Sequence, residues 1–89
     1  MDPIWVDTRS WDEFTEEHIS DAIWLSEDAW DSGLIDLMEH WIINPRPIVV
    51  YCSSESCGTS ARVADRLRGE PMSESGVFVL YGGWEAWKQ

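Results

Sequence analysis

The chain has 89 residues, a length that supports one modest hydrophobic core, so we expect a single domain over residues 1–89. Its 17 acidic and six basic residues give a net charge of −11, which argues against nucleic acid and anionic membranes as partners. No apolar run reaches membrane-spanning length and no secretory leader is visible, so we expect a cytoplasmic protein.

The first third of the chain alternates strand and helix signals. Residues 4–7 (IWVD) are typical of a short strand. Ser10 followed by Glu13 is a capping-box pattern, which predicts a helix that ends near Glu16. A second strand is expected over residues 22–25.

An amphipathic helix is expected between Ser32 and Trp41. Its apolar positions recur at i, i+3, i+4 and i+7, and they are Leu34, Leu37, Met38 and Trp41. The sequence NPRP over residues 44–47 should end this helix, because proline cannot continue it.

The second half of the chain predicts two strands without polar alternation, over residues 48–51 and 77–80, and this pattern is typical of strands buried on both faces. Between them a helix is expected over residues 59–68, with Gly69 as its stop. Its inner face would comprise Val63, Ala64 and Leu67. The alternation predicts a small, open, three-layer α/β domain with a central, mainly parallel sheet and helices on both faces.

Cys52 directly follows the strand expected over residues 48–51 and lies where the chain turns toward the next helix. In open α/β sheets, ligands bind beyond the carboxyl ends of the strands. Main-chain N–H groups of residues 53–58 and the positive end of the helix would favour a thiolate there, and a thiolate is a nucleophile. Glu55 in the same loop would oppose that anion. The hypothesis requires the sulfur to be accessible and to face those dipoles.

The chain resembles the rhodanese-like (sulfurtransferase) domain over nearly its whole length. The matching pieces, in order, are VDTRSWDEF, EHISDAIWL, VVYC and VFVLYGGWEAWK. The resemblance implies an enzyme in which Cys52 accepts a sulfane sulfur as a persulfide and passes it to a thiophilic acceptor. The implied donor is thiosulfate or a persulfide, carried by a small molecule or a protein, and the acceptor is a thiol or a cyanide-like group. No cofactor is implied. The substrate-binding loop would comprise Ser53, Ser54, Glu55, Ser56, Cys57 and Gly58.

Two departures from the family pattern have consequences. Glu17, Ser20 and Asp21 stand where the family commonly has glycines and a proline, so we expect this turn to avoid glycine-only backbone angles. The loop CSSESCG carries no cation, so slow turnover of the dianion thiosulfate is expected.

Alternative functions remain open. Cys57 is either a small structural residue or a thiol that resolves a persulfide on Cys52, which would give a thiol–disulfide redox protein. A non-catalytic interaction module with the same fold is a further alternative. Phosphatase chemistry on this fold is disfavoured, because Tyr51 and Gly58 stand where such phosphatases place His and Arg.

Other polar candidates favour structural interpretations. We expect Asp7 and Arg9 to form a salt-bridged brace at the end of the first strand. We expect His18 to be a hydrogen-bonded core residue, and His40 to lie at a helix end, where a cation is favourable. Two cysteines and two scattered histidines predict no metal site.

The seven tryptophans should supply much of the core, because each ring can bury about 150–250 Å². Trp84 and Trp87 are expected in the core. Trp30 is expected to pack against it.

Overall fold

Four parallel strands form the sheet in the part of the chain that the structure, a computed structural model, describes: residues 2–53 and 58–88. The strands lie in the order β2-β1-β3-β4. Their bounds are β1 (Ile4–Asp7), β2 (Ile23–Trp24), β3 (Ile48–Tyr51) and β4 (Val77–Val79). The parallel sheet that the strand–helix alternation predicted is therefore confirmed.

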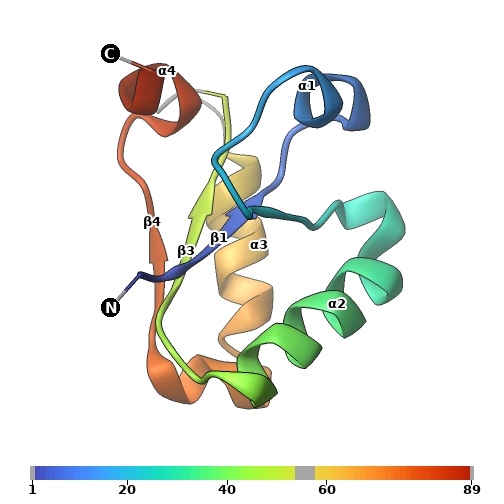
Figure 1. Cartoon of the computed structure of the whole chain (residues 1–89), viewed down its shortest axis with the longest axis vertical. Helices are drawn as coiled ribbons and strands as arrows, with labels where there is room; N and C mark the ends of the chain where they lie inside the picture. The colour runs from blue at the N-terminus through green and yellow to red at the C-terminus, as the bar shows by residue number, and fades with distance from the viewer. Residues whose placement is uncertain (1, 54–57, 89) are drawn as a thin grey trace.

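The helices connect these strands and follow the last of them (Figure 1). They are α1 (Trp11–Glu16), α2 (Trp30–Ile43), α3 (Thr59–Leu67) and α4 (Gly83–Lys88), with 3-10 turns η1 (Glu27–Ala29) and η2 (Pro71–Ser75). The predicted capping box is present, since Ser10 accepts from the Glu13 main chain and the Glu13 side chain accepts from the Ser10 main chain. Within the described residues, no helix combines the length and hydropathy that crossing a membrane requires.

The hydrophobic core lies between one face of the sheet and helices α2 and α3. It is built mainly of aliphatic side chains: Ile4, Val6, Ile23, Leu25, Leu37, Ile48, Val50, Val63, Ala64, Leu67, Met72 and Val77. Leu37 and the inner face predicted for α3 are buried, as expected. The expectation that tryptophans supply much of the core is wrong: Trp30 and Trp41 pack against its margin, and Trp11 is 55% exposed.

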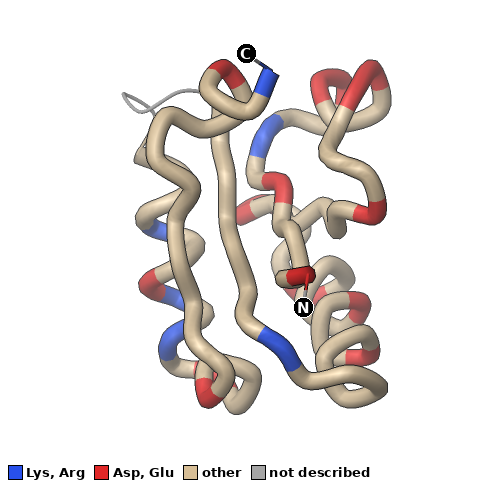
Figure 2. Tube along the Cα trace, turned by 60° about the vertical axis from the view of Figure 1, so that its left-hand side comes forward, with Lys and Arg blue, Asp and Glu red and all other residues tan. Residues whose placement is uncertain are grey.

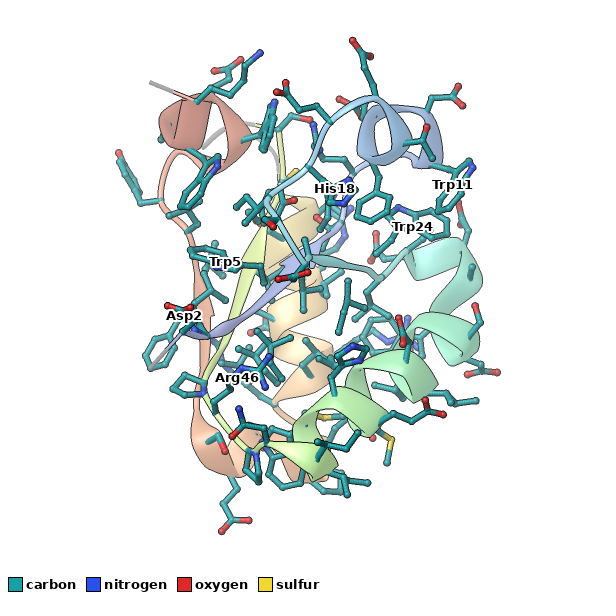
Figure 3. All side chains as sticks on the ribbon, viewed as in Figure 1. Asp2, Trp5, Trp11, His18, Trp24 and Arg46 are labelled. Atoms are coloured by element: carbon teal, nitrogen blue, oxygen red, sulfur yellow. The ribbon has the colours of Figure 1, made fainter. Side chains whose placement is uncertain are left out.

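The opposite face of the sheet is covered in part by α4. Ile4 and Val6 face the core, so Trp5 between them points to the other side of the sheet. The ring centroids of Trp5 and Trp87 lie 5.1 Å apart, which packs α4 against that face. In Figure 3, Trp5 lies on the left of the view, below α4 and away from α2. Helices therefore lie on both faces, as predicted.

Strand β4 differs from its prediction as a fully buried strand. Val77 faces the core, but Phe78 is 56% exposed and Val79 is 41% exposed. The reason is the strand order, which places β4 at an edge of the sheet, where β3 is its neighbour. Trp87 is likewise 46% exposed, so its prediction as a core residue is also wrong.

Two turns differ from expectation in their backbone angles. Asp21 has φ +67°, so the turn before β2 does use the left-handed region that we expected it to avoid. Aspartate tolerates this region better than most residues. At the end of α3 the helix stops at Leu67, one residue before the expected end at Arg68. Gly69 follows as the expected stop, but it lies outside the left-handed region and donates its N–H to the Arg66 carbonyl at 3.1 Å.

Candidate active site

Cys52 follows β3 directly, at the end of the sheet near which α1 and α4 lie (Figure 1). Strand β3 is paired on both sides, with β1 and with β4, so its carboxyl end is fixed within the sheet. The first turn of α4 holds the chain beyond it: Trp84 N–H donates to the Cys52 carbonyl at 2.7 Å, and Glu85 N–H donates to the Ser53 carbonyl at 3.1 Å. The backbone at Cys52 is therefore held by the strand and by α4.

The side chain of Cys52 is buried, with residue 52 only 2% exposed. It is also not a free thiol in this structure. The accessible sulfur that our hypothesis requires is therefore absent from this conformation. Chemistry at Cys52 requires reduction and an opening of its surroundings.

The predicted substrate loop is described only at its two ends. Ser53 is half-buried, and Gly58 is exposed immediately before α3. Gly58 has φ −84° and its carbonyl accepts from Arg62 N–H at 3.2 Å, as expected for the start of a helix. The predictions for Ser54, Glu55, Ser56 and Cys57 lie outside the described residues.

A buried polar network lies beside Cys52, at the carboxyl ends of β1 and β3. Asp7 and Arg9 form the predicted brace, with Arg9 Nη2 at 2.8 Å from Asp7 Oδ2. The Tyr51 hydroxyl donates to the same carboxylate oxygen at 2.7 Å and accepts from Ile19 N–H at 3.2 Å. Burial is the main cause that raises the pKa of Tyr51, so its hydroxyl stays protonated and donates to Asp7.

Sequence reasoning missed the role of Tyr51 and treated it only as an apolar strand residue. The network fixes the residue before Cys52 from three directions, because Thr8 N–H and Oγ1 also donate to the Tyr51 carbonyl at 3.0 and 2.9 Å. A signal was present: a tyrosine carries a hydroxyl that needs a partner when the ring is buried. The partner, Asp7, is 44 residues away, and only the strand pairing shows that they meet.

The side chain of Arg9 is held at the same end of the sheet, the carboxyl ends of β1 and β3. Its guanidinium donates to the Glu17 carbonyl at 2.6 Å and lies 4.5 Å from the centroid of the Trp84 ring. Trp84 thus contributes a main-chain donor to Cys52 and an aromatic face to Arg9, instead of the core packing that we expected. Because Arg9 is buried against Asp7, it is a brace and not an open anion-binding group.

A cavity of about 190 Å³ opens between α1 and α4, and we call it the α1–α4 cavity. Its lining residues are Arg9, Glu13, Glu16, Glu17, Trp84 and Lys88. It adjoins Cys52 through two contacts: Trp84 N–H to the Cys52 carbonyl, and Ser53 Oγ to Glu13 Oε2 at 3.3 Å. Three of the six lining residues are glutamates, so the cavity beside the Cys52 backbone is acidic, although Cys52 itself does not line it.

The two histidines lie away from this chemistry. His18 is exposed and not in the core as expected; its ring stacks on Phe14 at 3.9 Å, and its Nδ1 lies 2.7 Å from the Phe14 carbonyl oxygen. His40 lies in the last turn of α2, as predicted. Among residues 2–53 and 58–88, no group of three or more His, Cys, Asp or Glu side chains is arranged to hold a metal ion.

Comparison with known proteins identifies the family. The model of the rhodanese-like domain matches residues 1–89, the whole chain. The chain belongs to the rhodanese-like family. A search of curated proteins finds no match.

Membership in the rhodanese-like family agrees with the architecture. The four-stranded parallel sheet with helices around it is the arrangement that the resemblance implied. At a general level, the family supports a function as a sulfurtransferase-type protein or as a rhodanese-fold module. At the same level it supports partners that take part in sulfur transfer.

Proposed function

We propose that this rhodanese-like domain is a sulfurtransferase that carries sulfur as a persulfide on Cys52. The observation that carries the proposal is the position of Cys52, after the doubly paired strand β3 and beside the N-terminus of α4. This is where open α/β sheets bind ligands.

The reaction consists of two displacements at sulfur. The Cys52 thiolate attacks the outer sulfur of a persulfide R–S–S⁻. A new S–S bond forms, the bond to R–S breaks, and R–S⁻ leaves. An acceptor thiolate then attacks the outer sulfur of the Cys52 persulfide and regenerates the Cys52 thiolate. Main-chain N–H groups that stabilise a thiolate would also stabilise the persulfide anion.

Two alternatives compete with this proposal. A non-catalytic rhodanese-fold module is favoured by the burial of Cys52, which is 2% exposed. In the redox alternative, the Cys57 thiolate attacks the inner sulfur of the Cys52 persulfide, forms an intramolecular disulfide and releases HS⁻.

Intact mass spectrometry of the reduced protein separates the three candidates. Incubation with a low-molecular-weight persulfide should add one sulfur atom, and Cys52→Ser should abolish the addition. Cys57→Ser should leave the adduct unchanged for a simple carrier, but lengthen its lifetime if Cys57 resolves it. A module gives no adduct with any donor, and its Cys52 lacks the enhanced alkylation rate of an activated thiolate. Sulfur uptake by the Cys52→Ser variant would refute the proposed function.

A further inference from the structure

Among the described residues, Glu13 is an acidic side chain that contacts the residue directly after the candidate nucleophile. Its Oε2 accepts from Ser53 Oγ at 3.3 Å, and Ser53 follows Cys52 directly. Its Oε1 accepts from the Ser10 main chain at 3.3 Å and from Ser10 Oγ at 3.0 Å. Hydrogen bonds to both carboxylate oxygens therefore fix this group at the edge of the α1–α4 cavity.

The carboxylate of Glu13 carries its charge at neutral pH. The hydrogen bond from the Ser10 main chain, helped by the hydroxyls of Ser10 and Ser53, holds the pKa of Glu13 below its usual range. Glu13 also lies in the first turn of α1, where a negative charge is favourable.

The cations near this cavity are already engaged. Arg9 is buried against Asp7, and Lys88 Nζ lies 3.9 Å from Glu17 Oε1. Within the described part of the chain, neither Glu13 nor Glu16 forms an ion pair, and residues 53–58 include no Lys or Arg. Figure 2 shows acidic residues along α1, whereas α3 carries both arginines and an aspartate. The approach to Cys52 from α1 is therefore negative.

We propose that Glu13 sets the charge preference of the Cys52 site. The site exchanges sulfur with molecules that carry a cationic group near the reacting sulfur, and it discriminates against anions such as thiosulfate. The inference rests on the proposed function for its biological meaning, but it makes a claim about Cys52 that is measured without sulfur transfer.

The test compares two thiol reagents of similar size and opposite charge. These are the trimethylammonioethyl and sulfonatoethyl methanethiosulfonates, applied to reduced protein in a Cys57→Ser background so that Cys52 is the reacting thiol. The thiolate attacks the sulfenyl sulfur, a disulfide forms, the S–SO₂ bond breaks and methanesulfinate leaves. The ratio of the two rates cancels changes in the thiol itself and leaves the charge preference.

The cationic reagent should react faster, and Glu13→Gln should lower the cation-to-anion rate ratio by about three- to tenfold. Glutamine preserves the capping-box pattern, so α1 is expected to stay folded. Glu39→Gln, the same change at an exposed residue of α2, should leave the ratio unchanged. Rising ionic strength should lower the ratio in the unsubstituted protein and much less in Glu13→Gln.

A second arm separates the two proposals by offering 2-aminoethyl and 2-carboxyethyl persulfides as donors. If the persulfides form a Cys52 adduct but the cation-to-anion rate ratio is equal in Glu13→Gln and in the unsubstituted protein, the charge preference is overturned and the sulfurtransferase function stands. A lowered ratio without an adduct from either persulfide overturns the sulfurtransferase function alone. Failure of both thiosulfonates to react with Cys52 overturns both.

Discussion

At the scale of single residues, the strongest constraint on the candidate site is the contact between Tyr51 and Asp7. Both residues are fully buried, and their 2.7 Å hydrogen bond joins β3 to β1 directly before Cys52. A buried carboxylate is tolerated only when it is paired and hydrogen-bonded, and Arg9 and Tyr51 supply both conditions. The network therefore supports the backbone from which Cys52 projects.

Tyr51→Phe should destabilise the fold by about 1.5–3 kcal/mol at neutral pH, because Asp7 loses a donor and Ile19 N–H loses its acceptor. Burial raises the pKa of Tyr51, so the folded state keeps a proton that the unfolded chain releases near pH 10. The stability contribution of Tyr51 is therefore complete below about pH 10 and falls as pH rises above it. Urea unfolding from pH 7 to 11 should show a constant stability gap between the two proteins that narrows above pH 10.

The control for this measurement is Thr8→Val, which removes the 2.9 Å hydrogen bond from Thr8 Oγ1 to the Tyr51 carbonyl but no titrating group, so its loss of stability should not depend on pH. A gap that stays constant to pH 11 would contradict the role given to the Tyr51 proton. The Asp7–Arg9 brace could be predicted from sequence because its partners are two residues apart. Tyr51 could not be assigned to it, because the contact depends on the register between β1 and β3.

At the scale of elements, two turns determine where helices and strands meet the site. The turn before β2 carries Asp21 at φ +67°, and the turn before α4 carries Gly82 at φ +86°. Capping boxes and apolar spacing predicted α1, α2 and α3 well because these signals are local. The turn angles were less predictable. Asp21 stands in a turn where the family commonly has glycine, and a glycine there would have indicated the left-handed conformation.

Asp21→Gly should stabilise the protein by up to about 1 kcal/mol. Glycine removes the cost of the left-handed conformation, which exceeds the conformational entropy that glycine adds to the unfolded chain. Ser20→Gly, at the neighbouring position outside the positive-φ set, should instead be neutral or destabilising. Urea midpoints of the two variants provide the measurement, and a loss of stability in Asp21→Gly would show that the aspartate side chain supports the turn.

Gly82→Ala should cost more than about 1–2 kcal/mol, because a Cβ at this left-handed position would lie 2.6 Å from the Ala86 Cβ. The change would also displace the first turn of α4, and with it the Trp84 N–H that donates to the Cys52 carbonyl. Gly69→Ala is the matched control: its nearest neighbour is the Arg66 carbonyl oxygen at 3.5 Å, so we expect no loss of stability. Thermal unfolding compares the two, and equal losses would contradict this account of Gly82.

At the scale of the whole molecule, the parallel α/β architecture could be predicted, but the exposure of its edges could not. Phe78 and Val79 have the apolar pattern of a central strand, yet β4 lies at an edge, since strand order depends on contacts between distant segments. Trp87 could not be placed for the same reason: its partner, Trp5, lies at the other end of the chain. For the candidate site, sequence located Cys52 but did not predict its burial, which depends on how neighbouring segments pack over it.

The net charge of −11 predicts a stability that rises with salt. Excess negative charge repels itself in the compact state, and the screening length falls from about 30 Å at 0.01 M to about 3 Å at 1 M salt. Raising NaCl from 20 to 500 mM should stabilise the fold by ~1 kcal/mol or more, which exceeds the loss from screened surface ion pairs such as Arg62–Glu27. Urea midpoints at neutral pH measure this gain.

The same titration near the isoelectric point of about 4.2 should show little gain, because the net repulsion is then absent. A stability that is independent of salt at neutral pH would contradict this account of the net charge, whose acidic residues are spread over much of the chain in Figure 2.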